Sequence, residues 1–357
     1  MPLTGNVSPS GAATTERPRL LLLCNGTEQE TTGRLCMALA RNLERHFAVR
    51  LRLRSFPTGI LRKIPALVAG LAPRIPDILW ADAIIVHTTF SLSLIDIVLA
   101  RILGKKVYSL VWDIYPESFR IHGNISNPVL IGIQGLIEHL GYRLSTKMFV
   151  PSEDYIRFLP GYAQKKATVM PLWTTDPVAD VPAREVRDEL RVVFAGQINV
   201  LRSLTDAFQC VLGAVSGPIE AHLFSRDPAP DDLLGLAERE GRLMVSHHGF
   251  VSAEELQPIL RTMDFGLVAL VGDYNLPAFP SKIMAYAAAG LPILYSGPQS
   301  NRALADAISA SGIGLVLDSE RKMSKVDLEI FLREYPEKRD RFLEASDRGW
   351  EVIADIH

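Results

Sequence analysis

The chain has 357 residues, of which 48% are hydrophobic and 22% are charged, and its formal net charge is -2 at pH 7. This composition is typical of a soluble globular protein and leaves room for two domains of ordinary size. The near-neutral charge excludes a global attraction to nucleic acid, so any basic site has to be local. The three cysteines show no CxxC spacing, which argues against a disulfide framework and favours a reducing, cytoplasmic setting.

The N-terminal region shows no signal of a membrane span. Residues 1–18 are mostly polar, and we predict a disordered tail there. The apolar run at 20–24 is too short for the hydrophobic part of a signal peptide. No stretch approaches the roughly 18 consecutive apolar residues that a membrane span requires.

In the first half of the chain, β-like runs alternate with helical patterns. This alternation predicts βαβ units and a parallel sheet with helices on both faces. The expected strands are 20–24, 49–55, 83–87, 106–112 and 147–152, and the expected helices are 33–46, 91–103 and 128–143.

The alternation stops at residues 171–190, which contain three prolines and several charges and are predicted to be a linker. It then resumes, so we predict two doubly wound α/β domains. Ligands bind at the carboxyl ends of such sheets, and the cleft between the two sheets is the expected site. The predicted parts are an N-terminal domain at 19–170, the linker, a C-terminal domain at 191–335, and a C-terminal helix at 336–357 that returns to the first domain.

FPSKIMAYAAAGLPIL, residues 279–294, predicts a helix over 281–289 that ends at Gly290. Lys282 is the only charged residue of this segment and falls in the first helical turn. Because the positive end of a helix dipole disfavours a cation, we expect a phosphate or carboxylate partner there. The alternative is a lysine whose ammonium group simply reaches solvent.

A second phosphate candidate follows the expected strand at 191–196. Gly196 and Gln197 end this strand, and Arg202 stands just before a helix N-terminus, where a guanidinium group can clamp a phosphate. The alternative is a solvated loop arginine. Ser203 and Asp206 fit a capping box at the start of that helix.

HHGFVSAEEL, which starts at His247, contains two adjacent histidines. Neighbouring side chains on a strand point to opposite faces, so His247 and His248 do not easily share one ion, and no third ligand is spaced nearby. We therefore expect no metal. Ser252 and Glu255 predict a capping box at the following helix.

VWDIYPES, residues 111–118, places Asp113 and Glu117 beside aromatic residues after an expected strand. A carboxylate there can act as a base or can hydrogen-bond a sugar or alcohol. The alternative is a turn that Asp113 caps and Pro116 rigidifies. The loop after the first strand, which starts at Asn25, lacks GxGxxG and so argues against a dinucleotide fingerprint.

Residues 56–76 mix apolar positions with Arg62, Lys63 and Arg74. Such a basic, partly amphipathic segment can lie against an anionic membrane surface, which would make the protein peripheral on the inner face of the cell membrane. Core packing with a solvated basic edge explains the same pattern.

Together these segments resemble glycosyltransferase family 4, whose architecture is GT-B. The resemblance covers most of the chain from residue 19, with VVFAGQINVLRSL, SHHGFVSAEELQPILRTMDFGLVAL and FPSKIMAYAAAGLPIL in the order of the donor-binding segments and ATVMPLWTTDP at the entry to the linker. VWDIYPES resembles the first-domain loop of a subgroup that has a Pro-Ser-Lys donor helix and includes fucosamine transferases of bacterial surface polysaccharides.

The resemblance implies a role for each matching residue. Ser281 and Lys282 would bind the donor diphosphate, with Gly196 and Arg202 assisting, and Lys282 and Arg202 would stabilise it as it leaves. Gly249, Phe250 and Val251 would hold the nucleobase. The loop of Asp273, Tyr274 and Asn275 would face the donor sugar, and Gln197 would also contact the donor. Asp113 would stand at the reaction centre, with Asn25, Gly26, His87 and Glu117 on the acceptor side.

The sequence departs from the family pattern at three positions. Pro277 and Ala285 stand where many members have two glutamates, so the ribose-binding carboxylate is missing unless another residue supplies it. Trp112 stands where a histidine is often found, which places more chemical weight on Asp113.

The expected function is transfer of a sugar from a nucleotide diphosphate sugar, with UDP-sugar favoured, to a lipid-linked or oligosaccharide acceptor in bacterial surface or exopolysaccharide biosynthesis. The donor is a substrate, and no cofactor or obligatory metal is expected. Family 4 implies a retaining outcome by analogy. Three alternatives stay open: an inverting enzyme similar to GT-B glucuronosyltransferases with Asp113 as base, a non-catalytic nucleotide- or glycan-binding module, and a GT-B epimerase.

Overall fold

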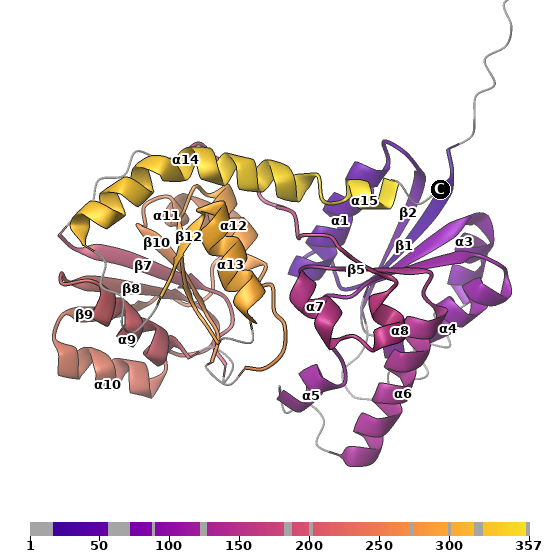
Figure 1. Cartoon of the computed structure of the whole chain (residues 1–357), viewed down its shortest axis with the longest axis horizontal. Coiled ribbons are helices and arrows are strands. Elements are labelled where there is room, and N and C mark those ends of the chain that lie inside the picture. The colour runs from indigo at the N-terminus through magenta and orange to yellow at the C-terminus, as the bar shows by residue number, and fades with distance from the viewer. Residues whose placement is uncertain are drawn as a thin grey trace, which may run out of the picture.

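The computed structural model describes residues 17–55, 72–87, 90–121, 127–181, 188–199, 203–271, 274–298, 301–317 and 324–354. These residues form two α/β domains side by side (Figure 1). Each domain has one six-stranded sheet, and all strand pairs within both sheets are parallel. The predicted class of two doubly wound domains is therefore confirmed.

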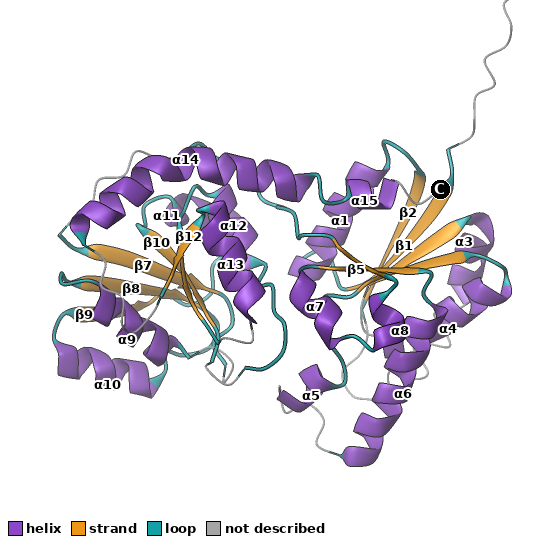
Figure 2. Ribbon diagram, viewed as in Figure 1, coloured by secondary structure: helices purple, strands orange, loops and turns teal. Residues whose placement is uncertain are grey.

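The first sheet is covered by helices on both faces (Figure 2). Its strands, in spatial order, are β2 (Ala48–Arg54), β1 (Arg19–Asn25), β3 (Ala83–His87), β4 (Lys106–Leu110), β5 (Lys147–Val150) and β6 (Ala167–Val169). Its helices are α1 (Thr31–Leu43), η1 (Ala72–Arg74), α3 (Ile75–Trp80), α4 (Phe90–Ile102), α5 (Glu117–Ile121), α6 (Pro128–Leu144), α7 (Glu153–Phe158) and α8 (Gly161–Gln164).

The second sheet repeats this layering. Its strands, in spatial order, are β12 (Gly314–Val316), β11 (Ile293–Ser296), β10 (Phe265–Ala269), β7 (Leu190–Ala195), β8 (Ile219–Phe224) and β9 (Leu243–His247). Its helices are α9 (Leu204–Ala214), α10 (Asp231–Glu240), α11 (Ala253–Leu260), α12 (Lys282–Ala288), α13 (Arg302–Ser311) and α14 (Lys325–Asp347). The last helix, α15 (Glu351–Ala354), packs on the first domain (Figure 1).

Burial on both faces of the central strands explains the layers. In β1, Leu20 and Leu22 pack with α1, whereas Leu21 and Leu23 pack on the opposite face with α3 and α4. A strand buried on both faces reads as a continuous apolar run, as LLLLC does. The strand ends therefore emerge from a rigid core at the edge of each sheet.

Helix α14 joins the two cores. Its Tyr335 packs in the second domain, and its Leu343 packs with Trp350 in the core of the first domain. The predicted boundary between residues 335 and 336 thus falls inside one continuous helix. The described parts of the predicted linker are 171–181 and 188–190. The first part contains no helix or strand, and Leu190 already begins β7. Trp173 of the linker donates an indole hydrogen bond to the Leu35 carbonyl.

Some predicted features lie outside the described residues: most of the N-terminal tail, residues 56–71 of the basic segment, residues 182–187 of the linker, residues 355–357 of the C-terminal helix, and Arg202 and Asp273. Among the described helices, none combines the length and the apolar character that crossing a bilayer demands.

Candidate active site between the two domains

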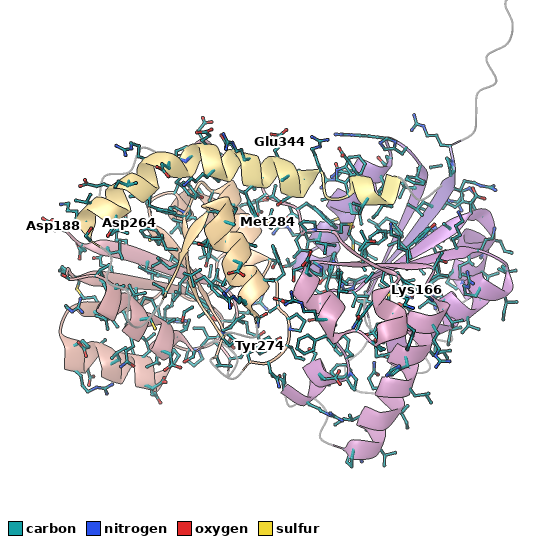
Figure 3. All side chains as sticks on the ribbon, in the orientation of Figure 1. Lys166, Asp188, Asp264, Tyr274, Met284 and Glu344 are labelled. Carbon is teal, nitrogen blue, oxygen red and sulfur yellow. The ribbon has the colours of Figure 1, made fainter. Side chains whose placement is uncertain are left out.

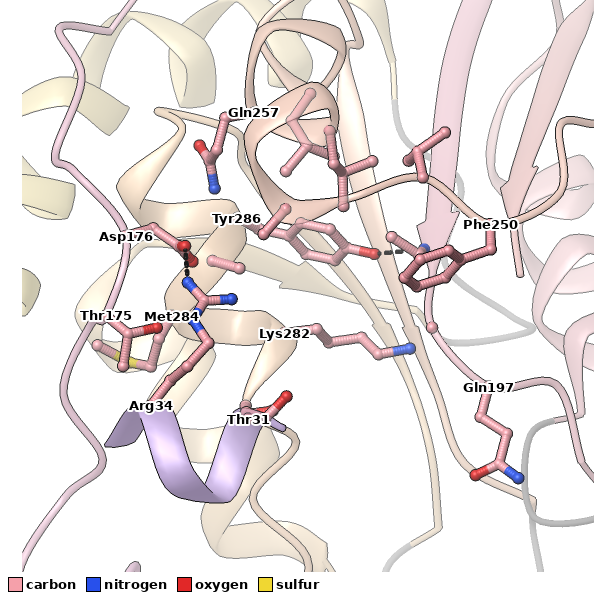
Figure 4. Close-up of a pocket in the computed structure, with 18 of the residues that line it drawn as sticks. Thr31, Arg34, Thr175, Asp176, Gln197, Phe250, Gln257, Lys282, Met284 and Tyr286 are labelled. Carbon is pink, nitrogen blue, oxygen red and sulfur yellow. Dashed lines mark hydrogen bonds and ion pairs between the residues drawn. The ribbon is translucent and has the colours of Figure 1, made fainter. Parts of the chain in front are cut away.

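A cavity of about 760 Å³ opens between the two domains. Thr31 and Arg34 of α1 line it from the first domain (Figure 4). From the second domain come the segments that follow β7, β8 and β9, together with α11 and the start of α12. Its size is typical of small-molecule sites, which run from about 300 to 1,000 Å³. Six residues predicted to bind the donor line it: Gly196, Gln197, Phe250, Val251, Ser281 and Lys282.

Lys282 points its ammonium group toward the end of β7. Its Nζ lies 3.6 Å from the centre of the Phe194 ring. A Cβ built on Gly196 would stand 3.3 Å from the same Nζ, and Gly196 has a φ of +133°, which L side chains rarely adopt. The structure therefore places a cation and a bare backbone together at the carboxyl end of a strand.

Helix α12 forms where it is predicted. It covers Lys282–Ala288, within one residue of each predicted end, and Ser281 stands at its N-cap without a side-chain cap hydrogen bond. Gly290 follows with a φ of +71°, as its predicted role at the helix end requires. Because the helix has only two turns, its dipole is small, and the charge of Lys282 dominates the local field.

Close packing fixes α12 on the sheet. The Tyr286 hydroxyl accepts a hydrogen bond from the Ala195 backbone amide at 3.0 Å. The Tyr286 ring lies against Gly266 of β10, where a Cβ would come within 2.5 Å of a ring carbon. The small residues of IMAYAAA let the helix approach this closely, so Lys282 starts from a rigid base.

The rim of the cavity carries an aromatic ring and a cation. Phe250 is 63% exposed, and the Arg226 guanidinium carbon lies 4.2 Å from its ring centre. Gly249 before it has a φ of +73°, which turns the chain out of β9. An exposed ring beside a guanidinium group suits a planar heteroaromatic ligand.

Two carboxylates line the cavity that the sequence did not single out. Asp227 accepts hydrogen bonds from the Ile198 amide at 2.9 Å and from the Ser225 hydroxyl at 3.3 Å. Asp176 of the linker forms an ion pair with Arg34 of α1. Pro277 and Ala285 still leave no carboxylate at the family's two glutamate positions. The cavity nevertheless contains the carboxylates of Asp176 and Asp227.

The sequence contains a signal for some of these cavity residues and none for others. Arg226 and Asp227 follow β8 directly, so the rule that ligands bind at the carboxyl ends of parallel strands was enough to find them. The pair between Arg34 and Asp176 joins residues 142 positions apart, and no local pattern marks either one.

The predicted sugar-facing loop is held mainly by the second domain. Asn301 donates to the Leu276 carbonyl at 2.8 Å and accepts from the Ala278 amide at 2.7 Å. Tyr274 is 9% exposed and packs in the domain core, whereas Asn275 is exposed. Neither belongs to the described lining of the cavity.

Asp113 lies outside the cavity, at the boundary between the domains. Burial, and then the nearby charges of Asp113 and Tyr274, raise the pKa of Tyr155. The Tyr155 hydroxyl also donates to the Trp112 carbonyl at 3.0 Å. Tyr155 is therefore close enough to Asp113 of the first domain and to Tyr274 of the second to interact with the charge of each, and Figure 3 shows Tyr274 at this boundary.

The predicted acceptor-side residues form a junction of strand ends. The Asn25 amide donates to the His87 carbonyl and to the Ser93 hydroxyl, both at 3.3 Å, and accepts from Arg54. Gly26 forms an isolated bridge with Arg54. These contacts join β1, β2, β3 and α4.

His87 and Glu117 differ in their environment. Burial and the Arg54 charge lower the pKa of His87 to about 3, so its imidazole is neutral near pH 7. The His87 ring packs 4.6 Å from the Trp112 ring, centre to centre. Glu117 is partly exposed at the start of α5.

One interpretation of the basic segment at 56–76 is corrected. Arg74 is buried, and its Nε donates to Asp96 at 2.7 Å. Asp96 also accepts from the buried Arg54 at 2.6 Å. Arg74 is thus part of an internal ion-pair network and not of a solvated basic edge.

The two adjacent histidines have different partners, and one of the two predicted capping boxes forms. His248 contacts His222 at 3.0 Å, whereas His247 contacts the Asp227 carbonyl at 2.9 Å, so the two neighbours point to different partners. The capping box of Ser252 and Glu255 is confirmed. The one at Ser203 is wrong, because Ser203 donates to the Asp206 side chain and caps no backbone amide. Within the described ranges, no three His, Cys, Asp or Glu residues are grouped to hold a metal ion.

The similarities of this chain to known proteins are structural. No protein-family model and no curated protein sequence matches it. The solved structure of WaaG, a glycosyltransferase involved in lipopolysaccharide biosynthesis, is similar with a TM-score of 0.56 at 13% identity, over 94% of this chain and 99% of that one. The lipopolysaccharide outer core galactosyltransferase WaaB has a TM-score of 0.56 at 11% identity, over 94% and 98%.

A plant enzyme shows the same likeness. A UDP-glucosyltransferase from Polygonum tinctorium capable of glucosylating indoxyl has a TM-score of 0.50 at 14% identity, over 96% of this chain and 99% of that one. At such identities the likeness concerns the fold. The chain has the GT-B fold, with two Rossmann-like domains on either side of a cleft, as predicted.

Proposed function

We propose that the protein is a glycosyltransferase that moves a sugar from a nucleotide diphosphate sugar, preferably a UDP-sugar. The acceptor would be a lipid-linked or oligosaccharide chain of a bacterial surface polysaccharide or exopolysaccharide. The main support is the Lys282 ammonium group beside Gly196 in the cavity between the domains. A cation next to a backbone without a side chain suits a diphosphate group. The likeness to WaaG and WaaB, both described as lipopolysaccharide enzymes, agrees with this class of reaction.

The proposed chemistry is electrostatic. When the bond between sugar and diphosphate breaks, negative charge grows on the leaving phosphate oxygens. Lys282 would stabilise this charge without an obligatory metal, with Arg202 as a further predicted contact. Phe250 and Arg226 would hold the nucleobase at the rim. Closure of the two domains would exclude water and so protect the donor from hydrolysis.

Asp113 is proposed as the acceptor-side group at the reaction centre. It follows β4 and lies near Tyr155 at the domain boundary. If Asp113 takes the proton of the acceptor hydroxyl during direct displacement, the configuration at the sugar inverts. Retention would instead place Asp113 in a binding role. The anomeric configuration of the product distinguishes these two mechanisms.

The test is nucleotide release. Purified protein is incubated with UDP- and GDP-sugars, with and without lipid-linked or oligosaccharide acceptors, and free nucleotide is measured. We expect release from at least one donor, a decrease of about 100-fold or more in Lys282→Ala, and loss of acceptor-dependent release in Asp113→Asn. Release that both variants leave unchanged would contradict the proposal.

A second candidate is a non-catalytic module that binds a nucleotide or glycan. Pro277 and Ala285, at the positions of the family's two glutamates, favour it. Binding of UDP or GDP without release from any donor and acceptor pair would support this candidate. An altered sugar nucleotide as product would instead indicate an epimerase.

A further inference from the structure

Helix α7 of the first domain meets the second domain through two adjacent side chains, Asp154 and Tyr155. The helix follows β5 and lies on the side of the first domain that faces the second (Figure 1). Both residues are buried, since Tyr155 is 2% exposed and Asp154 is 5% exposed. Buried polar groups cost free energy unless they are hydrogen-bonded, so the partners of these two side chains decide what α7 does at the boundary.

Asp154 caps a helix of the other domain. Its Oδ2 accepts a hydrogen bond from the Ala303 backbone amide at 2.9 Å, in the first turn of α13. The N-cap residue of α13, Asn301, makes no side-chain cap, because its amide group holds the loop at 276–278. A carboxylate at the positive end of a helix is favourable. The first domain therefore supplies the cap that α13 lacks in its own domain.

The Tyr155 hydroxyl joins the acceptor-side loop to the donor-side segment. It donates to the Trp112 carbonyl at 3.0 Å, and the Phe279 backbone amide donates to the same hydroxyl oxygen. Trp112 directly precedes Asp113, and Phe279 stands three residues before Lys282. One hydroxyl group thus connects the backbone beside the proposed acceptor-side carboxylate to the backbone that leads into the proposed diphosphate site.

The Phe279 side chain makes this connection stiff. It packs against hydrophobic clusters on both sides of the domain boundary. Because α12 begins at Lys282, a shift of Phe279 relative to Trp112 also moves the Lys282 ammonium group relative to Asp113. In an active site, a misplacement of about 1 Å can cost roughly 100-fold in rate.

We propose that Tyr155 and Asp154 are positioning residues that hold the two domains in one fixed arrangement, with the Asp113 loop facing the start of α12. Tyr155 sets the register between these two segments, and Asp154 fixes α13, whose Asn301 holds the predicted sugar-facing loop. Neither side chain belongs to the described lining of the cavity at Lys282, so both act through other groups. The kinetic effect of the pair rests on the proposed sugar transfer, whereas its contacts between the domains do not depend on it.

The expected kinetic effect is a change in where the sugar goes. With the domains held together, water is excluded and the sugar passes to the acceptor hydroxyl. When the register is loosened, each half of the site still binds its own ligand, but the two ligands are misaligned and water reaches the donor. A residue that only packs the core would lower the stability without changing the ratio of transfer to hydrolysis.

The kinetic test compares Tyr155→Phe with the wild type, because phenylalanine keeps the buried ring and removes only the hydroxyl. For the donor and acceptor that the wild type uses best, kcat for transfer should fall about tenfold or more, while the donor KM stays within about twofold. The ratio of transfer to donor hydrolysis should fall as well. Tyr162→Phe removes a hydroxyl that contacts His139 at 2.7 Å inside the first domain, and this control should behave like the wild type.

Hydrogen exchange tests the two contacts without any donor or acceptor. Exchange at the Ala303 amide should become about fivefold or more faster in Asp154→Ala, and exchange at the Phe279 amide should do so in Tyr155→Phe. Asp154→Asn keeps an oxygen that can accept from Ala303, so it should restore slow exchange and the wild-type ratio of transfer to hydrolysis. Ser324→Ala removes the cap of α14 inside the second domain and, as the control, should leave both amides unchanged.

Two results would overturn the proposal: unchanged exchange at Ala303 and Phe279 in the two variants, or a lower unfolding midpoint of Tyr155→Phe with an unchanged ratio of transfer to hydrolysis. A wild type that releases no nucleotide from any UDP- or GDP-sugar would reject sugar transfer, and the exchange rates would still test the contacts of α7. Faster exchange in the two variants of such an inactive protein would support the fixed arrangement of the domains.

Discussion

Glu138→Gln is expected to remove a pH dependence from the stability of the protein. Glu138 is 1% exposed on α6, and the Gln134 side chain donates to its Oε1 at 2.6 Å. Burial raises the pKa of this carboxyl group to about 8. The native protein therefore keeps a proton that the unfolded chain has already lost above about pH 4.5.

The sign follows from proton linkage. Between about pH 4.5 and 8 the native state binds one proton more than the unfolded state at this site, so stability falls as pH rises. With 1.36 kcal/mol per pKa unit, the loss between pH 6.5 and 8 is roughly 1.5 kcal/mol. Glutamine keeps the size and the contact with Gln134 but does not ionise, so the variant lacks this loss.

Urea unfolding at pH 6.5 and pH 8 measures the effect. The free energy of unfolding of Glu138→Gln minus that of the wild type should be roughly 1.5 kcal/mol larger at pH 8 than at pH 6.5. The buried His87 is common to both proteins and cancels in this difference. Glu238→Gln on the exposed side of α10 is the matched control, with a change below about 0.5 kcal/mol. The same difference at both pH values would refute the reasoning.

Three further substitutions test the site and its support. Gly196→Ala forces a side chain into a φ of +133° and toward Lys282, so unfolding in urea should show a loss of about 1–3 kcal/mol, and donor KM should rise. Phe250→Ala should weaken UDP binding in calorimetry about tenfold or more, because base stacking is lost, while Phe250→Tyr keeps it. Gly33→Ala brings a Cβ within 1.9 Å of the Thr27 carbonyl oxygen and should lower the unfolding midpoint sharply, whereas Gly132→Ala on α6, with open space around it, should raise it slightly. Unchanged values in any of these three measurements would contradict the contacts described.

Features that depend on neighbours in the chain were predictable. Strands and helices alternate in the sequence, and this periodicity alone defined two parallel sheets. Gly290 marked a helix end because its backbone conformation is rare for other residues. The isolated charge of Lys282 in an apolar segment pointed to a site, and its Nζ does lie in the cavity wall beside Gly196.

Features that depend on distant pairing were not predictable. Arg74 reads as part of a basic surface, yet it pairs with the buried Asp96. Arg34 and Asp176 meet only because the linker passes α1. The capping box at Ser203 failed because two side chains that match a local pattern can bond each other in place of the backbone.

The central claim is that the cavity at Lys282 binds the diphosphate of a nucleotide sugar. Calorimetric titration of UDP and GDP into the wild type and into Lys282→Met tests it most directly, since methionine keeps the apolar stem and removes only the charge. Lys325→Met, on the exposed start of α14, is the control. We predict binding of at least one nucleotide by the wild type and the control, and about 100-fold weaker binding by Lys282→Met. Equal affinity of all three proteins, or no binding of either nucleotide, would contradict the claim.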